Sequence, residues 1–259
     1  MLLLVDIGNT HTHVGLGDLR KSRPLFDLPT GDWQGGNNRL RLSQLVAGAD
    51  YKGACFCSVV PKASVSARSV LGDLVGESVI QLTPTTLRGV GIHYPRPESI
   101  GQDRLANAVA VSHHFGHPAV VVDFGTAVTF DVVDRSGDYV GGIITPGLAA
   151  MTDYLHEKTA LLPKITIREP KGVIGKNTEQ AMLIGAVRGY RGLVRSLIAE
   201  IKLELGARKL PVVATGGYAA LIARRIPEIT AVRPGLTLEG LRLTALAHGL
   251  GSGNALAHQ

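Results

Sequence analysis

The residues best suited to chemistry are aspartates that precede glycines at two matched places in the chain. Residues 2–16 read LLLVDIGNTHTHVGL, and residues 119–133 read AVVVDFGTAVTFDVV. Each segment is an apolar run that ends in Asp-x-Gly followed by Asn or Thr, and the two aspartates, Asp6 and Asp123, stand 117 residues apart. Because the glycines and the residues after them keep the same offset, the repeat indicates a duplicated domain.

Each copy predicts a strand, a tight turn and an antiparallel partner strand. A glycine in such a turn lets the backbone approach a ligand closely, and successive N–H groups form a concavity that binds anions. The carboxylate at the strand end complements this concavity, since it can hold a cation that bridges to phosphate oxygens. Either copy alone is also an ordinary hairpin turn, but the matched pair favours two loops that hold a nucleoside triphosphate.

A third polar group, Gly101-Gln102-Asp103-Arg104, opens a predicted helix. The N-terminus of a helix attracts anions through its dipole and its free N–H groups. Asp103 is either an ordinary helix-start residue or, in a phosphoryl-transfer site, the group that accepts the proton of an attacking alcohol. Arg104 would then neutralise charge on the substrate or on the transferring phosphoryl group.

Other motifs are weaker or incomplete. Residues 170–177 lack the first Gly and the final Ser/Thr of a Walker A loop, and residues 89–91 do not continue as a dinucleotide fingerprint. P-loop and nicotinamide chemistry are therefore excluded. Residues 215–217, Thr-Gly-Gly, fit either a close approach to a flat adenosine or a plain strand-to-helix turn. Thr178, taken by itself, is interpreted as part of a helix N-cap.

The elements that must position these groups follow an order of hairpins and helices that is given twice. The first half predicts a strand pair over residues 2–16, a helix from about residue 39, a strand over 54–60, a helix from 61 and another at 101. The second half predicts strands over 119–124, 127–133, 139–145 and 211–214, with helices from 146, over about 177–205 and from about 238. Such a pattern is typical of two α/β domains, with a boundary near residue 117.

Composition limits the class of protein. The 259 residues are 45% hydrophobic and their formal net charge of +6 is scattered rather than blocked, so no nucleic-acid partner is expected. Cys55 and Cys57 lie on one face of a predicted strand and are interpreted as buried thiols rather than metal ligands. No signal peptide or membrane-spanning stretch is expected. A reducing, cytoplasmic location follows.

Four motifs in order resemble those of type III pantothenate kinases, a bacterial family in the acetate and sugar kinase, Hsp70 and actin superfamily. They are Asp6-x-Gly8-Asn9-Thr10, Gly101-x-Asp103-Arg104, Asp123-x-Gly125-Thr126-Ala127-x-Thr129 and Gly141-Gly142-x-Ile144-x-Pro146-Gly147. The resemblance covers nearly the whole chain. It implies an α/β fold of two duplicated ribonuclease H-like (actin-like ATPase) domains with a nucleotide cleft between them, over residues 1–117 and 118–259.

The resemblance also implies an activity, which is transfer of the ATP γ-phosphoryl group to pantothenate to give 4'-phosphopantothenate, the first step of coenzyme A biosynthesis. Asp103 matches the catalytic proton acceptor, and Asp123 matches a position that binds a monovalent cation, K⁺ or NH₄⁺. Mg²⁺ is expected with the nucleotide. The ATP-binding positions implied are Asp6, Ile7, Gly8, Asn9, Thr10, His11, Thr12, His13 and Thr126. The pantothenate-binding positions implied are Tyr94, Gly101, Gln102, Asp103, Arg104 and Thr178.

In this family the residue that matches Thr178 is expected to reach the substrate site from the other subunit of a homodimer, so the resemblance partly replaces its interpretation as a cap. One departure concerns the first loop, where some members carry a Lys and this chain has His11-Thr12-His13. A lysine is a permanent charge, whereas a neutral histidine carries none. Whether His13 takes the place of that Lys at the phosphates is left open by the sequence.

Two alternatives share the fold. One is a related kinase that phosphorylates another small hydroxylated acid or a sugar, against which the segment 101–104 and Tyr94 argue. The other is a catalytically inactive regulator, because fold does not fix function. The presence of Asp6, Asp103 and Asp123 favours an enzyme, since an inactive site has no physical need for carboxylates beside phosphate.

Overall fold

The computed structural model describes residues 1–33, 37–46, 48 and 50–251. It divides into two compact units: unit 1 is formed by residues 1–114 together with the chain from residue 235, and unit 2 by residues 115–234. The boundary expected near residue 117 is close to this division, but residues 235–251 lie in unit 1 rather than with the second half of the chain. Residues 252–259, which the sequence analysis assigned to the second domain, lie outside the described residues.

Unit 1 is built on a sheet with the strand order β3-β2-β1-β4-β5. Strand β1 pairs antiparallel with β2 and parallel with β4, so the predicted hairpin is confirmed. The elements of this unit are β1 (Leu2–Ile7), β2 (His11–Gly17), β3 (Ser22–Pro29), the 3₁₀ turn η1 (Thr30–Trp33), α1 (Asn37–Leu45), β4 (Gly53–Ser58), α2 (Pro61–Val75), β5 (Val79–Gln81), β6 (Gly91–Ile92), η2 (Pro97–Ser99), α3 (Gln102–Phe115, which reaches the boundary) and α8 (Leu236–Ala247).

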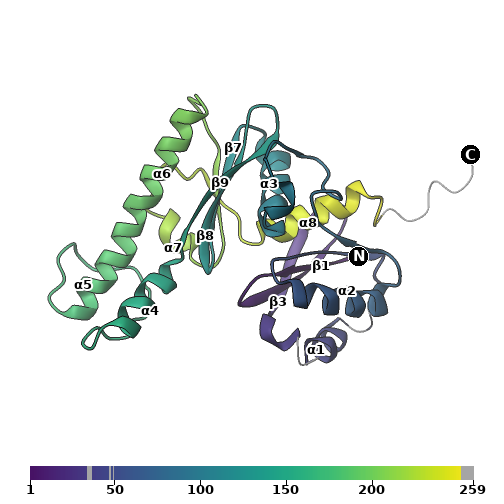
Figure 1. Ribbon diagram of the computed structural model, residues 1–259, viewed down its shortest axis with the longest axis horizontal. Helices are drawn as coiled ribbons and strands as arrows, with labels where there is room; N and C mark the ends of the chain where they lie inside the picture. The colour runs from purple at the N-terminus through teal and green to yellow at the C-terminus, as the bar shows by residue number, and fades with distance from the viewer. Residues whose placement is uncertain (34–36, 47, 49, 252–259) are drawn as a thin grey trace, which may run out of the picture. The chain divides into compact units, whose positions relative to one another are not determined.

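Side-chain alternation gives this sheet two differently covered faces. One face buries Leu3, Val5 and Ile7 of β1 in a core with the aliphatic face of α2. The other face carries Leu2, Leu4 and Asp6 and is covered by α8, which lies against β1 and β4 (Figure 1). The reactive aspartate of the first motif therefore belongs to the α8-covered face, at the end of its strand.

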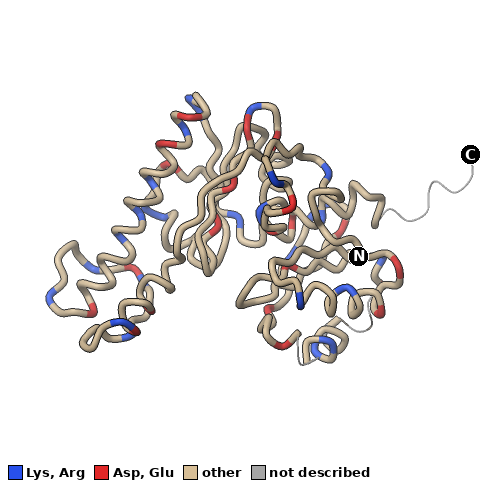
Figure 2. The backbone as a smooth tube through the Cα atoms, viewed as in Figure 1, with Lys and Arg blue, Asp and Glu red and all other residues tan. Residues whose placement is uncertain are grey.

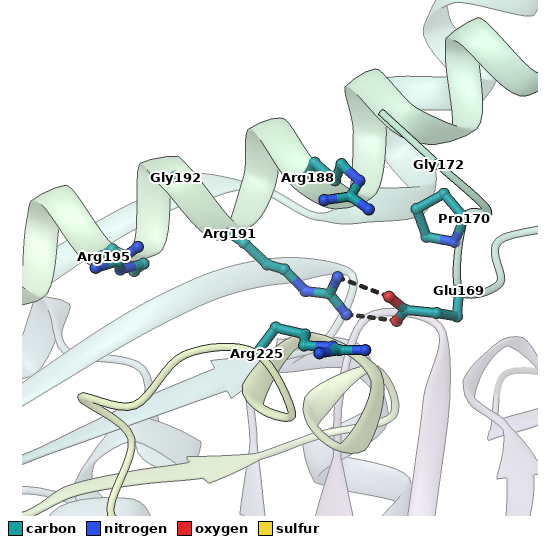
Figure 3. Close-up of a pocket in the computed structure, with 8 residues that line it drawn as sticks. All are labelled: Glu169, Pro170, Gly172, Arg188, Arg191, Gly192, Arg195 and Arg225. Atoms are coloured by element: carbon teal, nitrogen blue, oxygen red, sulfur yellow. Dashed lines mark hydrogen bonds and ion pairs between the residues drawn. The ribbon is translucent and has the colours of Figure 1, made fainter. Parts of the chain in front are cut away.

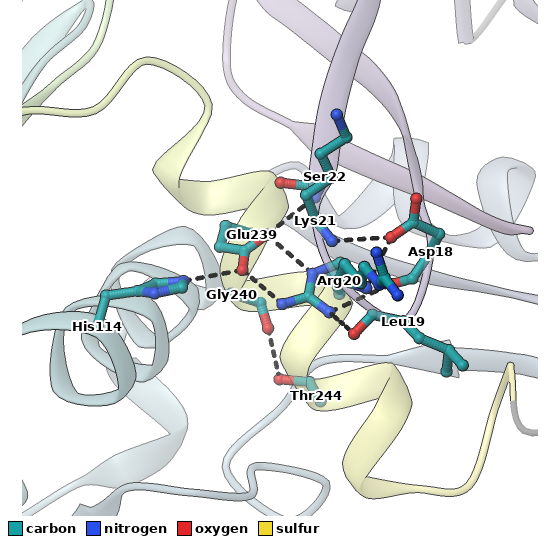
Figure 4. A network of polar contacts seen from close by, with 10 residues as sticks. Asp18, Leu19, Arg20, Lys21, Ser22, His114, Glu239, Gly240 and Thr244 are labelled. Atoms are coloured by element: carbon teal, nitrogen blue, oxygen red, sulfur yellow. Dashed lines mark hydrogen bonds and ion pairs between the residues drawn. The ribbon is translucent and has the colours of Figure 1, made fainter.

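A polar network joins helix α8 to the turn between β2 and β3 (Figure 4). Arg242 donates to both carboxylate oxygens of Glu239 at 2.9 and 2.6 Å and to the carbonyl oxygens of Asp18 and Leu19 at 3.2 Å each. Burial alone would raise the pKa of Glu239, but hydrogen bonds from Arg242, the Ser22 N–H and His114 lower it to about 2. This network explains why the chain returns to unit 1 after residue 234.

Helix α3 packs closely against α8. A Cβ at Gly240 would overlap the backbone of Ala106, so only a glycine permits this approach. The buried Thr237 hydroxyl donates to the side-chain oxygen of Asn107 at 3.0 Å. Together these contacts fix the position of α3, whose first turn carries Asp103.

Unit 2 repeats the plan of unit 1. Its own strands are ordered β11-β10-β7-β8-β9, with β7 antiparallel to β8 and parallel to β10. Reading β7, β8, β9, β10 and β11 in place of β1, β2, β3, β4 and β5 gives the same topology, which confirms the duplication. The elements are β7 (Ala119–Phe124), β8 (Ala127–Val133), β9 (Asp138–Pro146), α4 (Leu148–Lys158), α5 (Thr178–Ile184), the π-helical turn η3 (Gly185–Gly189), α6 (Tyr190–Glu204), β10 (Val212–Thr215), α7 (Ala219–Ala223) and β11 (Ala231–Val232).

The helical stretch expected over about 177–205 is continuous but not uniform. It begins as α5, passes through the π turn η3, which is bounded by Gly185 and Gly189, and continues as α6. Glycine weakens a helix interior, which makes this a favourable place for the change of hydrogen-bond pattern. Helix α6 then buries an apolar face in the core of unit 2, formed by Tyr190, Val194, Ile198 and Ile201.

Strand β3 is the one long element that the sequence pattern does not predict. It is an edge strand, most of its residues are exposed or half-buried, and it contains Pro24 and Pro29. Without alternating apolar residues it carries no local strand signal, and proline is tolerated because an edge strand leaves one row of N–H groups unpaired. Its pairing with β2 decides its structure.

Candidate functional site

Asp6 lies at the carboxyl end of β1, directly opposite His13 on β2 and Cys57 on β4. Only 9% of its surface is exposed. The Cys57 thiol donates a hydrogen bond to Oδ1 of Asp6, with the sulfur 3.2 Å from that oxygen. Both cysteines are buried and free, as expected, but the contact with Asp6 was not predicted, since the sequence offers no signal that pairs residues 51 positions apart.

The carboxyl group of Asp6 has a raised pKa. Burial and, after it, the negative charge of Asp103 raise the pKa of Asp6 to about 6, against the opposing effects of His13 and of the hydrogen bond from Cys57. Asp103 is therefore close enough to repel Asp6, although the two residues are far apart in the sequence. The structure brings the Asp6 turn and the Gly101–Arg104 group together within unit 1.

Asp103 stands in the first turn of α3, as predicted. Burial raises its pKa, while the N–H and the charge of Arg104 act to lower it. The Arg104 N–H donates to Oδ1 of Asp103 at 2.8 Å, and a Cβ at Gly101 would lie 2.6 Å from that same oxygen. Gly101 is thus required by the way the carboxylate folds back over the start of the helix. A carboxylate with a raised pKa is a stronger base than an exposed one.

The Gln102 side chain connects the start of α3 to strands β4 and β5. Its Oε1 accepts the Ser58 N–H at 2.9 Å and the Gln81 side-chain amide at 3.3 Å. Since Ser58 ends β4 directly after Cys57, this contact holds the start of α3 against the strand that faces Asp6. The sequence predicted a pantothenate contact for Gln102 and gave no sign of this link between elements.

The predicted nucleotide loop, residues 6–13, divides between the core and the surface. The Gly8 N–H donates to the carbonyl oxygen of His11 at 3.0 Å and closes the turn, in which Asn9 and Thr10 are exposed. The side chains of Ile7 and Thr12 are completely buried. The Thr12 hydroxyl bonds with Thr30 at 3.1 Å and accepts from Trp33 at 2.9 Å, so any contact of Ile7 or Thr12 with a ligand is left to the backbone.

His11 and His13 alternate with Thr12 and point to the exposed side of β2, with their rings 6.5 Å apart. Nδ1 of His13 lies 2.7 Å from Oδ1 of Asp27 on β3. His13 therefore stands between two carboxylates, Asp6 across the strand pair and Asp27 on its other side.

The second motif repeats this arrangement in unit 2. Asp123 ends β7 opposite Thr129 on β8 and Thr215 on β10, as Asp6 stands opposite His13 and Cys57. The Gly125 N–H donates to the Ala127 carbonyl oxygen at 3.1 Å, and Gly147 donates to that of the exposed Thr126 at 3.1 Å. The turn is one residue shorter than that of unit 1. For this reason the residue opposite Asp123 is Thr129, six positions later, whereas the residue opposite Asp6 is His13, seven positions later.

Gly216 packs closely against the side chain of Asp123. Its φ is +88°, and a Cβ there would lie 2.5 Å from Oδ1 of Asp123 and 2.7 Å from the Phe124 backbone. The Thr-Gly-Gly segment was predicted either as a plain turn or as a close approach to adenosine; in the structure its glycine lets the backbone pack directly against the Asp123 carboxylate.

The remaining predicted substrate residues lie on the surface. Tyr94 of unit 1 is 38% exposed. Thr178 of unit 2 is exposed at the first position of α5, and Asn177 caps that helix by accepting the Gln180 N–H at 2.9 Å. The cap is therefore Asn177, and the hydroxyl of Thr178 is not needed for it.

A divalent cation fits the carboxylates of unit 1. Among the described residues, no three His, Cys, Asp or Glu side chains gather as a ligand set. Mg²⁺ does not need one, since it usually binds through one or two carboxylates, waters and the phosphates of its substrate. The repulsion between Asp6 and Asp103 is what such a cation would relieve.

Comparisons with known proteins agree with this geometry. A family model described as type III pantothenate kinase matches residues 2–200. A type III pantothenate kinase of Akkermansia muciniphila is 48% identical over 244 residues, which cover 94% of this chain and 97% of the relative.

Solved structures show the same fold at low identity. A Campylobacter jejuni protein described as a Baf family transcriptional activator aligns with a TM-score of 0.61 at 18% identity, over 95% of this chain and 98% of its own. A Sinorhizobium meliloti protein described as a 2-dehydro-3-deoxygalactonokinase aligns with a TM-score of 0.57 at 12% identity, over the full length of both chains. In the described part of the chain, no helix has the length and apolar character that a membrane span requires.

Proposed function

The chain belongs to the type III pantothenate kinase family, and we propose that Asp103 is the proton acceptor when the terminal hydroxyl of pantothenate attacks the γ-phosphoryl group of ATP. The protein is an ATP-dependent phosphotransferase, and its reaction is the first step of coenzyme A biosynthesis. The observation that carries the role of Asp103 is its buried position beside Asp6, because burial raises its pKa and makes it a better base.

The phosphate side is assigned to the two glycine turns. The exposed turn at Asn9 and Thr10 and the exposed polar side chains of residues 8–13 bind the phosphates of ATP, and Thr126 contacts ATP from its own turn. Asp6 holds Mg²⁺, directly or through water, and this ion supplies neutralisation of phosphate charge. The buried Cys57 thiol, which donates a hydrogen bond to Asp6, keeps its carboxylate in place.

The substrate side is assigned to Tyr94, the segment Gly101–Arg104 and Thr178. Arg104 neutralises the carboxylate of pantothenate or charge on the phosphoryl group. The position of Asp103 over Gly101 supports this assignment, since it places a base at a helix N-terminus.

A homodimer, with Thr178 supplied by the partner subunit, is part of the proposal. It is supported by large apolar side chains that stay exposed on and after α4, namely Met151, Tyr154, Leu155, Leu161, Val173 and Ile174. Exposed apolar groups of this kind are typical of a surface that meets another protein. Light scattering of the purified protein tests it, and a mass of one chain would reject it. A cytoplasmic location is proposed from the two free, buried cysteines, and cell fractionation tests it.

The first experiment measures ADP release with ATP, magnesium and pantothenate, comparing K⁺ or NH₄⁺ with Na⁺ as the only monovalent cation. We expect pantothenate-dependent turnover that requires K⁺ or NH₄⁺, because the Asp123 carboxylate is the proposed ligand of the monovalent cation. Turnover that is equal in Na⁺ would reject that site. No turnover in any of the salts would instead favour a related kinase or an inactive regulator.

A second prediction concerns His13 in place of a lysine. If the imidazolium contacts a phosphate, the KM for ATP rises as pH increases across 5–8, where histidines lose their proton. The groups that face this ring are Asp6, Asp27 and His11. The measurement is the KM for ATP at each pH for the native protein and for a His13→Lys variant, whose KM should stay flat. A flat native profile would show that His13 makes no such contact.

A further inference from the structure

A pocket of about 540 Å³ lies in unit 2, and none of its lining residues is assigned to the reaction (Figure 3). One wall is η3 and α6, the opposite wall is the segment around residue 170, and the turn after α7 closes one side. The lining residues are Glu169, Pro170, Gly172, Arg188, Arg191, Gly192, Arg195 and Arg225. Four arginines thus surround one glutamate.

The arginines share a face because of their spacing. Arg188, Arg191 and Arg195 follow one another at intervals of three and four residues, which places them on one side of the helical stretch. Figure 2 shows the recurrence of basic positions along α6. Like charges at these intervals destabilise a helix slightly, so negative charge in front of such a helix face is favourable.

The guanidinium group of Arg191 already has hydrogen-bond partners within the protein. It binds both carboxylate oxygens of Glu169, at 3.1 and 2.6 Å, and donates to the carbonyl oxygens of Leu221 and Ile222 at 2.6 and 3.3 Å. The Arg191 side chain is only 8% exposed. The hydrogen bond from Arg191 lowers the pKa of Glu169, and the charges of Arg225 and Arg224 act in the same direction. Arg191 and Glu169 therefore form an ion pair with no net charge at one side of the pocket.

The other arginines leave an excess of positive charge. Arg195 donates to Glu228 at 3.0 Å. Within the part of the chain that the structure describes, the side chains of Arg188 and Arg225 make no hydrogen bond or ion pair, and they come from different walls of the pocket (Figure 3). Gly192 adds open space between them, since a Cβ there would meet nothing within 4 Å. The pocket thus presents two unengaged guanidinium groups to a space wide enough for a small molecule.

From these contacts we propose that the pocket is a second ligand site, which binds the phosphoryl group of a phosphate ester or a polyphosphate between Arg188 and Arg225. A guanidinium group matches phosphate oxygens with paired N–H donors, and a doubly charged phosphoryl group can serve two of them at once. The pocket is much larger than one phosphate ion, which leaves room for the rest of such a ligand. None of the lining residues belongs to the proposed catalytic set, so binding here can be measured independently of turnover.

Isothermal titration calorimetry tests the proposal with two probes, inorganic pyrophosphate and glycerol 3-phosphate, while a non-hydrolysable ATP analogue fills the nucleotide site. The native protein is expected to bind at least one probe. An Arg188→Gln/Arg225→Gln variant is expected to lose about tenfold or more in affinity, with kcat unchanged. Binding of pyrophosphate alone would identify a polyphosphate site, and binding of both would identify a site that accepts esters.

Two controls separate a specific pocket from general attraction. An Arg208→Gln/Lys209→Gln variant removes the same charge from exposed positions that do not line the pocket, and its affinity should match the native value. A Gly192→Glu variant, which puts a carboxylate into the open space without removing an arginine, should bind more weakly. Equal loss in both charge-removal variants, or no binding of either probe to the native protein, would overturn the proposal.

Discussion

Replacing Asp103 by asparagine is expected to lower kcat by about 10²–10⁴-fold, the range that a positioned general base contributes. Asparagine retains Oδ1, which accepts the Arg104 N–H, so the fold of the helix start should survive. It cannot take a proton at neutral pH, so the attacking hydroxyl loses its acceptor. The measurement is steady-state ADP release with pantothenate and ATP, together with the affinity for ATP.

The matched control is Asp50→Asn, which makes the same chemical change at an exposed residue of unit 1. That variant should keep the native kcat. The thermal unfolding curve of the Asp103→Asn protein should show no loss of stability, because a buried charge has been removed. A turnover equal to that of the native enzyme would contradict the role of Asp103, whereas a loss of ATP binding would show that the variant disturbs the nucleotide loop instead.

Replacing Asp6 by asparagine is expected to stabilise the ligand-free protein and to abolish most of its turnover. Burial and the charge of Asp103 raise the pKa of Asp6 from 3.8 to about 6 in the folded state. The folded state therefore holds the proton more tightly than the unfolded chain does. Stability from this group is fully present below about pH 4 and is lost as the pH rises to about 6.

Above pH 6 the buried carboxylate costs about 2–3 kcal/mol, since each unit of pKa difference corresponds to about 1.4 kcal/mol. Asparagine keeps the acceptor for the Cys57 thiol and carries no charge, so the variant should regain this free energy. The expected rise in Tm at pH 8 is roughly 4–12 °C, and little change is expected at pH 4. Turnover should fall because the proposed ligand for Mg²⁺ is lost.

A double-mutant cycle makes this test sharper. In an Asp103→Asn background, the stabilising effect of Asp6→Asn should be smaller, because part of the repulsion has already been removed. Calorimetry of the four proteins at pH 8, without nucleotide or magnesium, measures the difference. Destabilisation by Asp6→Asn, or a gain that is the same at pH 4 and pH 8, would contradict an electrostatic origin of the effect. A retained catalytic group that reduces stability is a common cost of function.

Local patterns in the sequence predicted much of the fold. Strands β7 and β8 have the predicted bounds, and α2 begins at Pro61 as expected, since proline suits the first turn of a helix. These elements are specified by alternation and by turn residues, which lie close together in the chain. Strand β3 lacks such alternation and was missed.

The site divides in the same way. The repeated Asp-x-Gly phrase and the Gly101–Arg104 group identified the residues of the proposed chemistry and, through their resemblance to a family, the reaction itself. They also predicted the turns at Gly8 and Gly125, because a tight turn is a local property of its residues.

Only the tertiary structure decided which of these residues face one another. The Cys57 thiol meets Asp6 because β1 and β4 pair in one particular register, and Asp103 reaches the same place because α3 packs on α8 through Gly240. The four arginines that line the pocket of unit 2 likewise come together only when residue 225 is folded against α6. Strand register and helix docking join residues that are distant in the chain, and they are set by the sum of many weak contacts that no short motif records.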